Sequence, residues 1–197
     1  RFDGRLTLLV NDGTANFPEP RTIGPGFPGV TEMHLMDLDD DSDLDLVATS
    51  ALLDEVIWAA NDGTGTFDNY TLLAVIDSAM GLTVTDLDQD GDPDLLATGY
   101  NAGAVFLIEN MGSGTFTSAA SLVAGMPGAK DVDLTDIDGD GDDDLVISAY
   151  ATSGFHWCAN DGAGNFGASQ LIDASNTVQV AEVADLDGDG DLDIATG

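Results

Sequence analysis

Residues 136–144 read DIDGDGDDD, and three other stretches of the chain repeat this pattern. They are DLDDDSDLD at 37–45, DLDQDGDPD at 86–94 and DLDGDGDLD at 185–193. Aspartate stands at positions 1, 3, 5, 7 and 9 of each stretch, and the first residues are 49, 50 and 49 positions apart. A period of this length is typical of propellers and other arrays of repeated units. We call these four stretches the acidic loops.

A second motif, Asn-x-Gly-x-x-x-Phe, recurs with the same period. It occupies 11–17, 61–67, 110–116 and 160–166, in steps of 50, 49 and 50 residues. Between the motifs lie short apolar runs rich in Val, Ile, Leu and Thr, interrupted by Gly, Asn or Asp, which is typical of strands. No segment has a sustained helical period. The sequence therefore predicts an all-β protein with almost no helix.

Each repeat contains four expected strands. In the first complete repeat they cover 31–36 and 44–50, around the acidic loop, and then 55–61 and 67–75, around the Asn-x-Gly turn. Both faces of the third expected strand are apolar, which is typical of a sheet that is covered on both sides. Small four-stranded sheets packed face to face around an axis are propeller blades. We therefore predict one β-propeller domain over residues 1–197, built of about 50-residue blades, with four repeats in this chain.

The chain begins just before an expected third strand and stops just after an expected second strand. Joining its ends would keep successive acidic loops 49 residues apart. We therefore expect the N-terminal strands to complete the blade begun at the C-terminus, which would remove open sheet edges. Three assemblies fit this pattern: a four-bladed ring of one chain, an eight-bladed ring shared by two chains, and a segment of a longer array. The whole number of repeats favours closure.

Carboxylates at alternate positions of a tight loop indicate a metal site. Ca²⁺ takes six to eight oxygen ligands and tolerates irregular geometry, whereas Mg²⁺ demands a stricter octahedron. By analogy with other DxDxDG loops, we expect coordination by the side chains at positions 1, 3, 5 and 9 and by the backbone carbonyl at position 7. About four calcium ions would bind. The candidate metal residues are Asp37, Asp39, Asp41, Asp43, Asp45, Asp86, Asp88, Asp90, Asp92, Asp94, Asp136, Asp138, Asp140, Asp142, Asp144, Asp185, Asp187, Asp189, Asp191 and Asp193.

Position 6 of the loop should need a positive φ, which glycine adopts readily. Gly91, Gly141 and Gly190 meet this need, but Ser42 stands there in the first loop, where we expect the pattern to be weakest. Pro93 is compatible because position 8 need not donate a hydrogen bond. An EF-hand would require a bidentate glutamate at position 12 and a following helix. The residues at position 12 are Ala48, Ala97, Ile147 and Thr196.

Aspartate-rich turns also end strands without any metal. One such turn would leave the two interpretations open. Four turns in register, each with at least five carboxylates in nine residues, would repel themselves strongly without a counterion. This repetition favours calcium with a structural role, because a formed site exists only in the folded chain.

The composition excludes several classes of function. The formal net charge is −33, with 37 acidic residues against four Lys and Arg. Such a surface repels nucleic acid and anionic membranes and favours cations or basic partners. Cys158 is the single cysteine, so no intramolecular disulfide forms. The apolar runs are too short to span a membrane, and no signal peptide is present, as expected for a processed or excised segment.

The acidic loops, together with the NxGxxxF motif at a spacing near 50, resemble the FG-GAP/VCBS repeats of integrin-α-like propellers, of certain lectins and of large secreted bacterial proteins. The resemblance covers nearly the whole chain. It implies an extracellular, secreted or cell-surface calcium-binding propeller that serves recognition or adhesion, with a carbohydrate or extracellular protein as ligand. Members of this family typically have seven or eight blades.

Two further functional classes remain open. One is a structural subunit or spacer of a surface assembly, in which open blade edges would favour homo-oligomers or strand exchange between chains. The other is part of a secreted polysaccharide-active enzyme, with or without catalysis. We expect no enzyme, because His34 and His156 lie in different repeats and no GxSxG, HExxH or phosphate-binding loop occurs. His156 and Cys158 share a strand face that could begin a zinc site, but packing explains them better.

Aromatic side chains follow the second expected strand of several repeats. Phe2, Tyr100 and Tyr150 stand at equivalent places, and Leu52 replaces them in one repeat. An exposed ring could stack on a sugar, but packing between blades explains these residues better. The sequence does not select a ligand.

Overall fold

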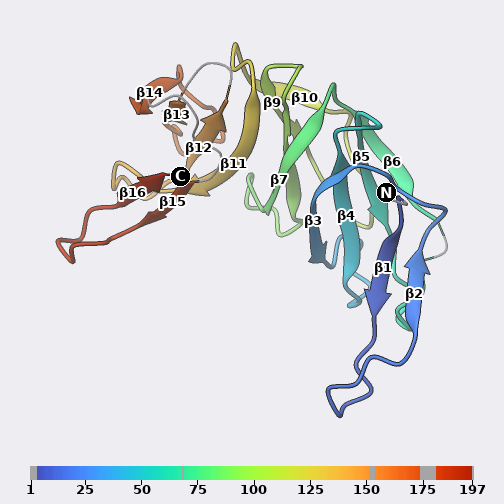
Figure 1. The fold of residues 1–197 in the computed structure, drawn as a ribbon. Coiled ribbons are helices and arrows are strands. Elements are labelled where there is room, and N and C mark those ends of the chain that lie inside the picture. The colour runs from blue at the N-terminus through green and yellow to red at the C-terminus, as the bar shows by residue number, and fades with distance from the viewer. Residues whose placement is uncertain (1–3, 68, 151–153, 174–180, 197) are drawn as a thin grey trace.

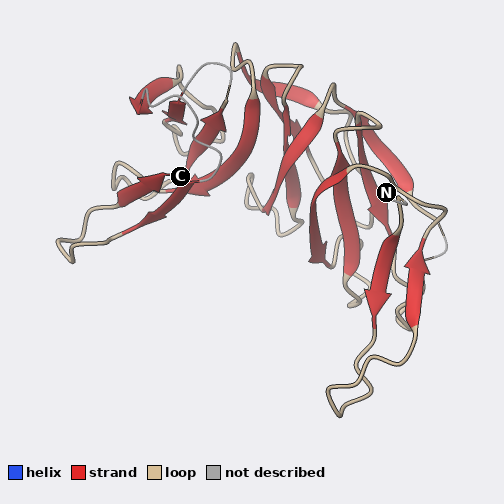
Figure 2. Cartoon of the chain, in the orientation of Figure 1, coloured by secondary structure: helices blue, strands red, loops and turns tan. Residues whose placement is uncertain are grey.

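The computed structural model describes residues 4–67, 69–150, 154–173 and 181–196, and within these ranges the chain forms sixteen strands and no helix (Figures 1 and 2). Three antiparallel sheets have four strands each, with neighbours in chain order. The first blade contains β3 (Val30–Met36), β4 (Asp45–Ser50), β5 (Glu55–Ala59) and β6 (Thr71–Val75). The second blade contains β7 (Ala79–Thr85), β8 (Asp94–Gly99), β9 (Ala104–Ile108) and β10 (Ala120–Ala124). The third blade contains β11 (Ala129–Thr135), β12 (Asp144–Ala149), β13 (Gly154–Cys158) and β14 (Gln170–Asp173).

Two hairpins flank the three blades. The N-terminal hairpin pairs β1 (Leu6–Leu9) with β2 (Pro20–Ile23), and the C-terminal hairpin pairs β15 (Ala181–Ala184) with β16 (Asp193–Thr196). The five sheets follow one another around an arc, with the hairpins at its opposite ends (Figure 1). Among the described residues the hairpins are separate sheets, so their union into one blade stays a prediction.

The blades pack face to face through their first two strands. β7 contacts β3 and β4 on one side and β11 on the other. The second strand of every blade, β4, β8 or β12, is buried along its whole length. On β8, Leu95 packs toward the first blade and Leu96 toward the third. Alternate residues of one strand therefore enter two different cores, which explains why these strands carry continuous apolar runs rather than alternating ones.

The sequence predicted that both faces of the third strand are covered. In the structure, burial on both faces is most complete in the second strand. The third strands β5, β9 and β13 are also largely buried, with two half-buried residues each. Second and third strands both have sheet neighbours on two edges, so the difference comes from the packing between blades. The contacts between blades are made mainly by the first and second strands, and the third strand lies farther from them. The expected four-stranded, all-β blades are confirmed. No helix in the described residues is long and apolar enough to cross a membrane.

The candidate metal centre

The acidic loops occupy one recurring place in the fold. Each connects the first strand of a blade to the second: β3 to β4, β7 to β8, β11 to β12, and β15 to β16. The adjacent strands are antiparallel and in register up to the loop, where Met36 pairs with Asp45 and Thr135 with Asp144. The loop therefore closes a hairpin whose ends the sheet holds fixed. This confirms that loops 49 or 50 residues apart occupy equivalent positions.

The aspartate at position 1 organises the turn of its own loop. In the first loop, Asp37 Oδ1 accepts a hydrogen bond from the backbone amide of Asp40 at 2.9 Å, and its Oδ2 accepts one from Ser42 at 2.9 Å. In the third loop, Asp136 accepts the equivalent bonds from Gly139 and Gly141 at 2.8 and 3.0 Å. These bonds wrap the backbone around the carboxylate, so that later side chains turn toward it.

Two positions of every loop adopt a positive φ. Position 6 does so as expected, at 100° in Gly91 and Gly141, 99° in Gly190 and 75° in Ser42. Position 4 does so as well, a requirement that sequence reasoning missed. The residues there are Asp40, Gln89, Gly139 and Gly188, with φ of 67°, 62°, 75° and 81°. The glycines at position 4 of the third and fourth loops could have indicated this requirement from the sequence. The first loop therefore places two non-glycine residues in the left-handed region.

The aspartate at position 9 is a structural anchor. Asp45, Asp94 and Asp144 are all at most 1% exposed. In the first blade, Asp45 Oδ1 accepts the backbone amide of Asn61 at 2.8 Å, and Oδ2 accepts the indole Nε1–H of Trp58 at 3.0 Å. Asn110 and Asn160 donate their backbone amides to Asp94 and Asp144 at the same 2.8 Å. The asparagine of the second motif thus holds each of the first three acidic loops to the neighbouring turn.

The first glycine of the second motif lies against position 7 of the acidic loop. A Cβ atom on Gly63 would lie 2.5 Å from Oδ2 of Asp43, and one on Gly162 would lie 2.5 Å from Oδ2 of Asp142. Both glycines also have a positive φ, at 77° and 75°. The two sequence motifs are therefore one structural unit, since the turn can approach the loop only without a side chain at this point.

Each loop gathers three carboxylates whose nearest oxygens lie within 4.8 Å of one another. The groups share positions 1 and 3 and differ in the third member, which is position 5 in the first two loops and position 9 in the last two. They are Asp37, Asp39 and Asp41; Asp86, Asp88 and Asp90; Asp136, Asp138 and Asp144; and Asp185, Asp187 and Asp193. The position 7 side chains, Asp43, Asp92, Asp142 and Asp191, join no group among the described residues. Such groups could hold metal ions.

Asp39 shows the electrostatic cost of this arrangement. Its Oδ1 is buried and has no hydrogen-bond partner among the described atoms. Burial, followed by the nearby charges of Asp45 and Asp41, raises the pKa of Asp39 above its usual value. A buried carboxylate oxygen without a donor is strongly disfavoured unless a cation compensates it.

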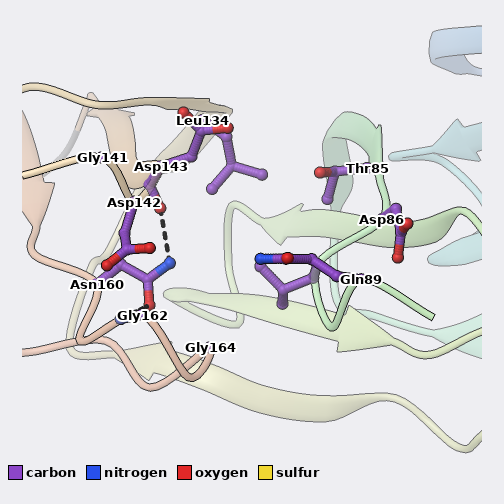
Figure 3. A pocket seen from close by; sticks show the side chains of 11 residues that line it. Thr85, Asp86, Gln89, Leu134, Gly141, Asp142, Asp143, Asn160, Gly162 and Gly164 are labelled. Carbon is purple, nitrogen blue, oxygen red and sulfur yellow. Dashed lines mark hydrogen bonds between the residues drawn. The ribbon is translucent and has the colours of Figure 1, made fainter. Parts of the chain in front are cut away.

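A polar pocket of about 140 Å³ lies between the second and third blades (Figure 3). Thr85, Asp86, Leu87 and Gln89 line it from the end of β7 and the second acidic loop. Leu134, from β11, and the third acidic loop and its turn supply the other wall, through Gly141, Asp142, Asp143, Asn160, Gly162 and Gly164. The pocket therefore lies beside two of the candidate metal loops.

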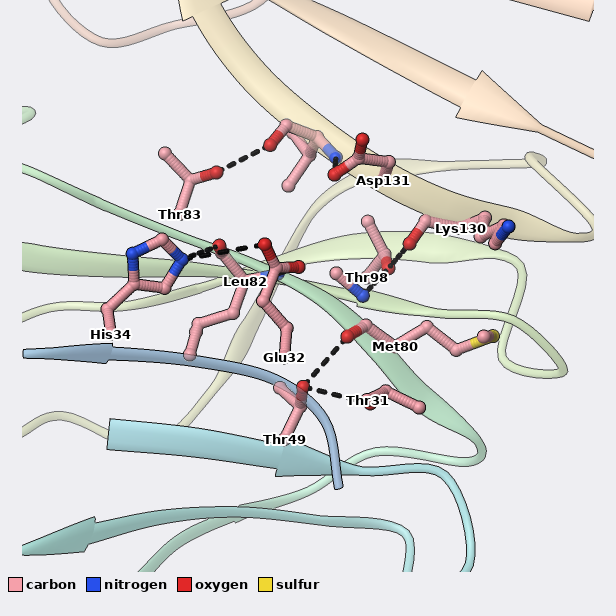
Figure 4. A network of polar contacts seen from close by, with 12 residues as sticks. Thr31, Glu32, His34, Thr49, Met80, Leu82, Thr83, Thr98, Lys130 and Asp131 are labelled. Atoms are coloured by element: carbon pink, nitrogen blue, oxygen red, sulfur yellow. Dashed lines mark hydrogen bonds and ion pairs between the residues drawn. The ribbon is translucent and has the colours of Figure 1, made fainter. Parts of the chain in front are cut away.

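The inner strands are joined by side chains that bond to the backbone of the next blade (Figure 4). On β3, His34 Nε2 lies 2.7 Å from the carbonyl of Leu82, and Glu32 Oε2 accepts the Leu82 amide at 2.8 Å. Thr49 and Thr98 donate to the carbonyls of Met80 and Lys130 at 2.7 and 3.1 Å. His34, weighed above as a catalytic candidate, thus contributes to the docking of one blade on the next.

His156 and Cys158 form no metal site among the described residues. His156 Nδ1 lies 3.0 Å from Ser169 Oγ, and burial lowers the pKa of this imidazole. Cys158 is fully buried in the core between the second and third blades. Burial, with the charge of Asp144, raises the pKa of its thiol to about 11. A protonated core thiol is a poor ligand and a poor nucleophile.

The two tyrosines that follow the second strands lie near each other on adjacent blades. Their ring centroids are 6.4 Å apart, with 34° between the ring planes. The ring of Tyr150 is 44% exposed, and Leu52 at the equivalent place in the first blade is 69% exposed. The contact supports the packing interpretation, since each ring covers part of the other. Phe2 lies outside the described residues.

A family model of the FG-GAP-like repeat matches residues 37–97, 86–147 and 136–196. Curated protein sequences contain no match. Among solved structures, a lectin of Agrocybe aegerita that recognises non-reducing terminal N-acetylglucosamine is similar to this chain with a TM-score of 0.64 and 22% identity, over 96% of this chain and 54% of the lectin. The chain thus spans about half of that protein, and the likeness shows the fold.

Two further structures are more distant. The V. cholerae biofilm matrix protein Bap1 has a TM-score of 0.48 and 16% identity, over 83% of this chain and 27% of Bap1. A Tc holotoxin pore of Photorhabdus luminescens has a TM-score of 0.47 and 18% identity, over 98% of this chain and 10% of the toxin chain.

Proposed function

Because the chain belongs to the FG-GAP-like repeat family, we propose that it is a calcium-stabilised module for recognition or adhesion that works outside the cell. Its ligand is a carbohydrate or an extracellular protein, and the calcium ions are structural. The lectin-like arrangement of blades supports a recognition function. We assign no catalytic step to the module: His34 docks one blade on the next, His156 Nδ1 lies at hydrogen-bond distance from Ser169 Oγ of its own repeat, and Cys158 is buried in a core.

The carboxylate groups of the acidic loops carry the calcium proposal. Three carboxylates approach within 4.8 Å in each loop, and the Asp39 oxygen is buried without a donor. The basic residues of the chain, Arg1, Arg5, Arg21 and Lys130, all lie outside the loops. Oxygen-only donors of this kind fit Ca²⁺, and the side chains at positions 1, 3, 5 and 9 with the position 7 carbonyl would hold it.

Calcium would act on stability because the site exists only in the folded chain. Binding to the native state alone stabilises it by mass action, and the loops join the first and second strands, which make most of the contacts between blades. Extracellular modules with such ligands bind calcium at about 10⁻⁴ to 10⁻³ M. External calcium saturates sites of this affinity, whereas resting cytosolic levels do not, which favours an extracellular or cell-surface setting.

Calcium removal tests the proposal. We expect excess EDTA to lower the melting temperature by well over 10 °C and to increase cleavage by proteases, with recovery on addition of calcium. Magnesium and high sodium chloride serve as controls, since screening relieves repulsion but supplies no coordination. A melting temperature that is the same in EDTA and in calcium would overturn the structural role of calcium.

Ligand recognition needs a separate measurement. A glycan array and a screen of extracellular proteins, both with calcium present, would identify the ligand class. Binding to a glycan that EDTA abolishes would support the lectin-like alternative. Absence of any ligand on both screens, for a protein that melts cooperatively with calcium, would overturn recognition and favour a structural subunit.

A further inference from the structure

One side chain that differs between the repeats lies close to the pocket between the second and third blades, although it is not itself one of the lining residues. Trp58 of β5 and Leu107 of β9 occupy the same place in their blades, opposite Val47 and Leu96 of the second strands. In the first blade the indole reaches the turn of the next blade, where a Cβ atom on Gly114 would lie 2.5 Å from Cη2 of Trp58.

The leucine is too short to fill the corresponding space. At Gly164, which is the equivalent of Gly114, a Cβ atom would meet only Leu87 Cγ, at 4.0 Å. The resulting pocket of about 140 Å³ is many times the roughly 15 Å³ that one water needs. It is large enough for the end of a ligand side chain.

The polar lining of the pocket is rich in hydrogen-bond acceptors. The side chain of Asn160 is already committed, because it donates to the carbonyl of Asp143 and accepts the amide of Gly162. The side chains of Thr85, Gln89 and Asp142 make no hydrogen bond among the described contacts. Figure 3 shows Gln89 reaching in from the second blade and Asp142 standing on the opposite wall. Asp142 also belongs to no carboxylate group that could hold a metal.

Gln89 has a left-handed backbone conformation, as does Asp40 at the same position of the first loop. Its φ of 62° is in the left-handed region, at a loop position where the third and fourth loops use glycine. A residue with a Cβ atom is disfavoured there relative to glycine. This conformation brings an amide to the edge of the pocket, which a glycine could not provide.

We propose that this pocket binds the guanidinium group of an arginine on a basic partner protein. The planar fork of arginine matches a carboxylate on one wall and an amide oxygen on the other, and it is weakly hydrated compared with an ammonium group. No basic residue is among the described residues that line the pocket, and the net charge of −33 attracts a cationic partner from a distance. A neutral sugar would not pair with the Asp142 charge, and among the described lining residues the apolar side chains are those of Leu87 and Leu134.

Titration calorimetry with short peptides tests this assignment. The probe is acetyl-Gly-Arg-Gly-amide, and its matched control replaces arginine by citrulline, which has nearly the same shape without the charge. With calcium saturating and salt near physiological strength, we expect saturable binding of one arginine peptide per chain. Citrulline should bind at least about tenfold more weakly.

Two variants locate the binding. Leu107→Trp copies the residue of the preceding blade, so it should fold and abolish binding, while Leu107→Met conserves volume and should retain it. Asp142→Asn should weaken binding about tenfold or more. A calcium-dependent melting transition in each variant verifies that it folds. If Leu107→Trp does not fold, Asp142→Asn alone tests whether the peptide binds in this pocket.

Four results would overturn the assignment. The first is the absence of saturable binding up to about 10 mM peptide, and the second is equal binding of the citrulline peptide. The third is arginine binding that survives both Leu107→Trp and Asp142→Asn. The fourth is a neutral monosaccharide that binds, and whose binding Leu107→Trp abolishes, while the arginine peptide does not bind. The last result would identify the pocket as a sugar site.

This inference rests on the proposed recognition function, and the same variants distinguish the two. If Leu107→Trp retains the ligand found on the glycan array or in the protein screen, recognition stands and the pocket is not its site. If wild type binds the arginine peptide but no ligand appears in either screen, the pocket stands and recognition of a physiological partner fails.

Discussion

At the scale of single residues, the acidic loop is destabilised by the backbone conformation that it requires. Positions 4 and 6 both need a positive φ, and the first loop meets this with Asp40 and Ser42 at 67° and 75°. Residues with a Cβ atom are disfavoured there, whatever the space around them. The first loop is therefore the most strained of the four, which agrees with the weakness expected from Ser42.

Glycine at residue 42 should relieve this strain. We expect Ser42→Gly to raise the free energy of unfolding by about 1 kcal/mol, measured by urea denaturation with calcium present. The matched reverse change is Gly91→Ala, where φ is 100° and a new Cβ atom would contact nothing within 4 Å. It should lower stability by about 1–2 kcal/mol through the backbone alone. A loss of stability in Ser42→Gly would show that the serine side chain contributes more than its strain costs.

His34 should make stability depend on pH. Glu32, whose Oε1 lies 3.6 Å from Nε2, raises the pKa of His34, burial opposes this, and the Leu82 carbonyl raises it further. Asp133 on β11 adds a weaker attraction in the same direction. The folded protein therefore holds the proton more tightly than the unfolded chain. This stabilisation is fully present below the unfolded pKa of about 6.5 and is lost as pH rises through the folded value.

Denaturation at a series of pH values from 5.5 to 8.5 measures the effect. We expect wild type to lose stability toward the alkaline end, and His34→Gln, which can still donate to Leu82, to show a flatter profile. Stability that rises with pH in wild type but not in His34→Gln would mean that burial, and not Glu32, dominates this histidine.

At the scale of elements, the Asn-x-Gly turn fastens one blade to the next as well as to its own loop. Asn110 is 1% exposed, and its Nδ2 donates to the carbonyls of Leu38 in the preceding blade and Pro93 in its own, at 3.1 and 3.3 Å. Asn61 makes only the second kind of bond, to Leu44 at 3.1 Å, near the surface. The same motif is therefore expected to contribute more to the free energy of unfolding in the second repeat, at Asn110, than in the first, at Asn61.

Alanine substitution at the two asparagines should reveal this difference. Asn110→Ala leaves buried carbonyls without a donor, so we expect a loss of about 2–3 kcal/mol in the free energy of unfolding. Asn61→Ala should cost about 1 kcal/mol or less, because water can replace its amide. Equal losses in the two variants would show that the bond between blades contributes nothing beyond the bond within the blade.

At the scale of the whole molecule, metal binding and charge are coupled. Four calcium ions would change the formal net charge from −33 to −25, and all four would bind at the connections between first and second strands. Self-repulsion at such charge density disfavours the compact state, and salt screens it. Calcium should therefore affect neighbouring blades together, since the first and second loops each lie beside the following blade.

Equilibrium dialysis should find about four calcium ions per chain, with the first loop binding most weakly. Ser42→Gly should strengthen the weakest site, whereas Gly91→Ala should weaken the second. We expect calcium affinity to fall with added sodium chloride while the number of ions stays the same. A stoichiometry of one or none would overturn the equivalence of the four loops.

The sequence by itself determined the repeat, the strand content and the position of the acidic loops. These follow from local chemistry that repeats: alternating aspartates, glycine at position 6, and apolar runs of strand length. It could not determine that position 4 also needs a positive φ, that position 9 is an anchor bonded to an asparagine 16 residues away, or that His34 docks one blade on another. Only the tertiary structure decided these, because they depend on which backbone atoms of distant strands come within hydrogen-bonding distance. The same reason applies to the pocket. Leucine at residue 107, where the preceding blade has Trp58, leaves space only because the turn of another blade lies opposite this side chain.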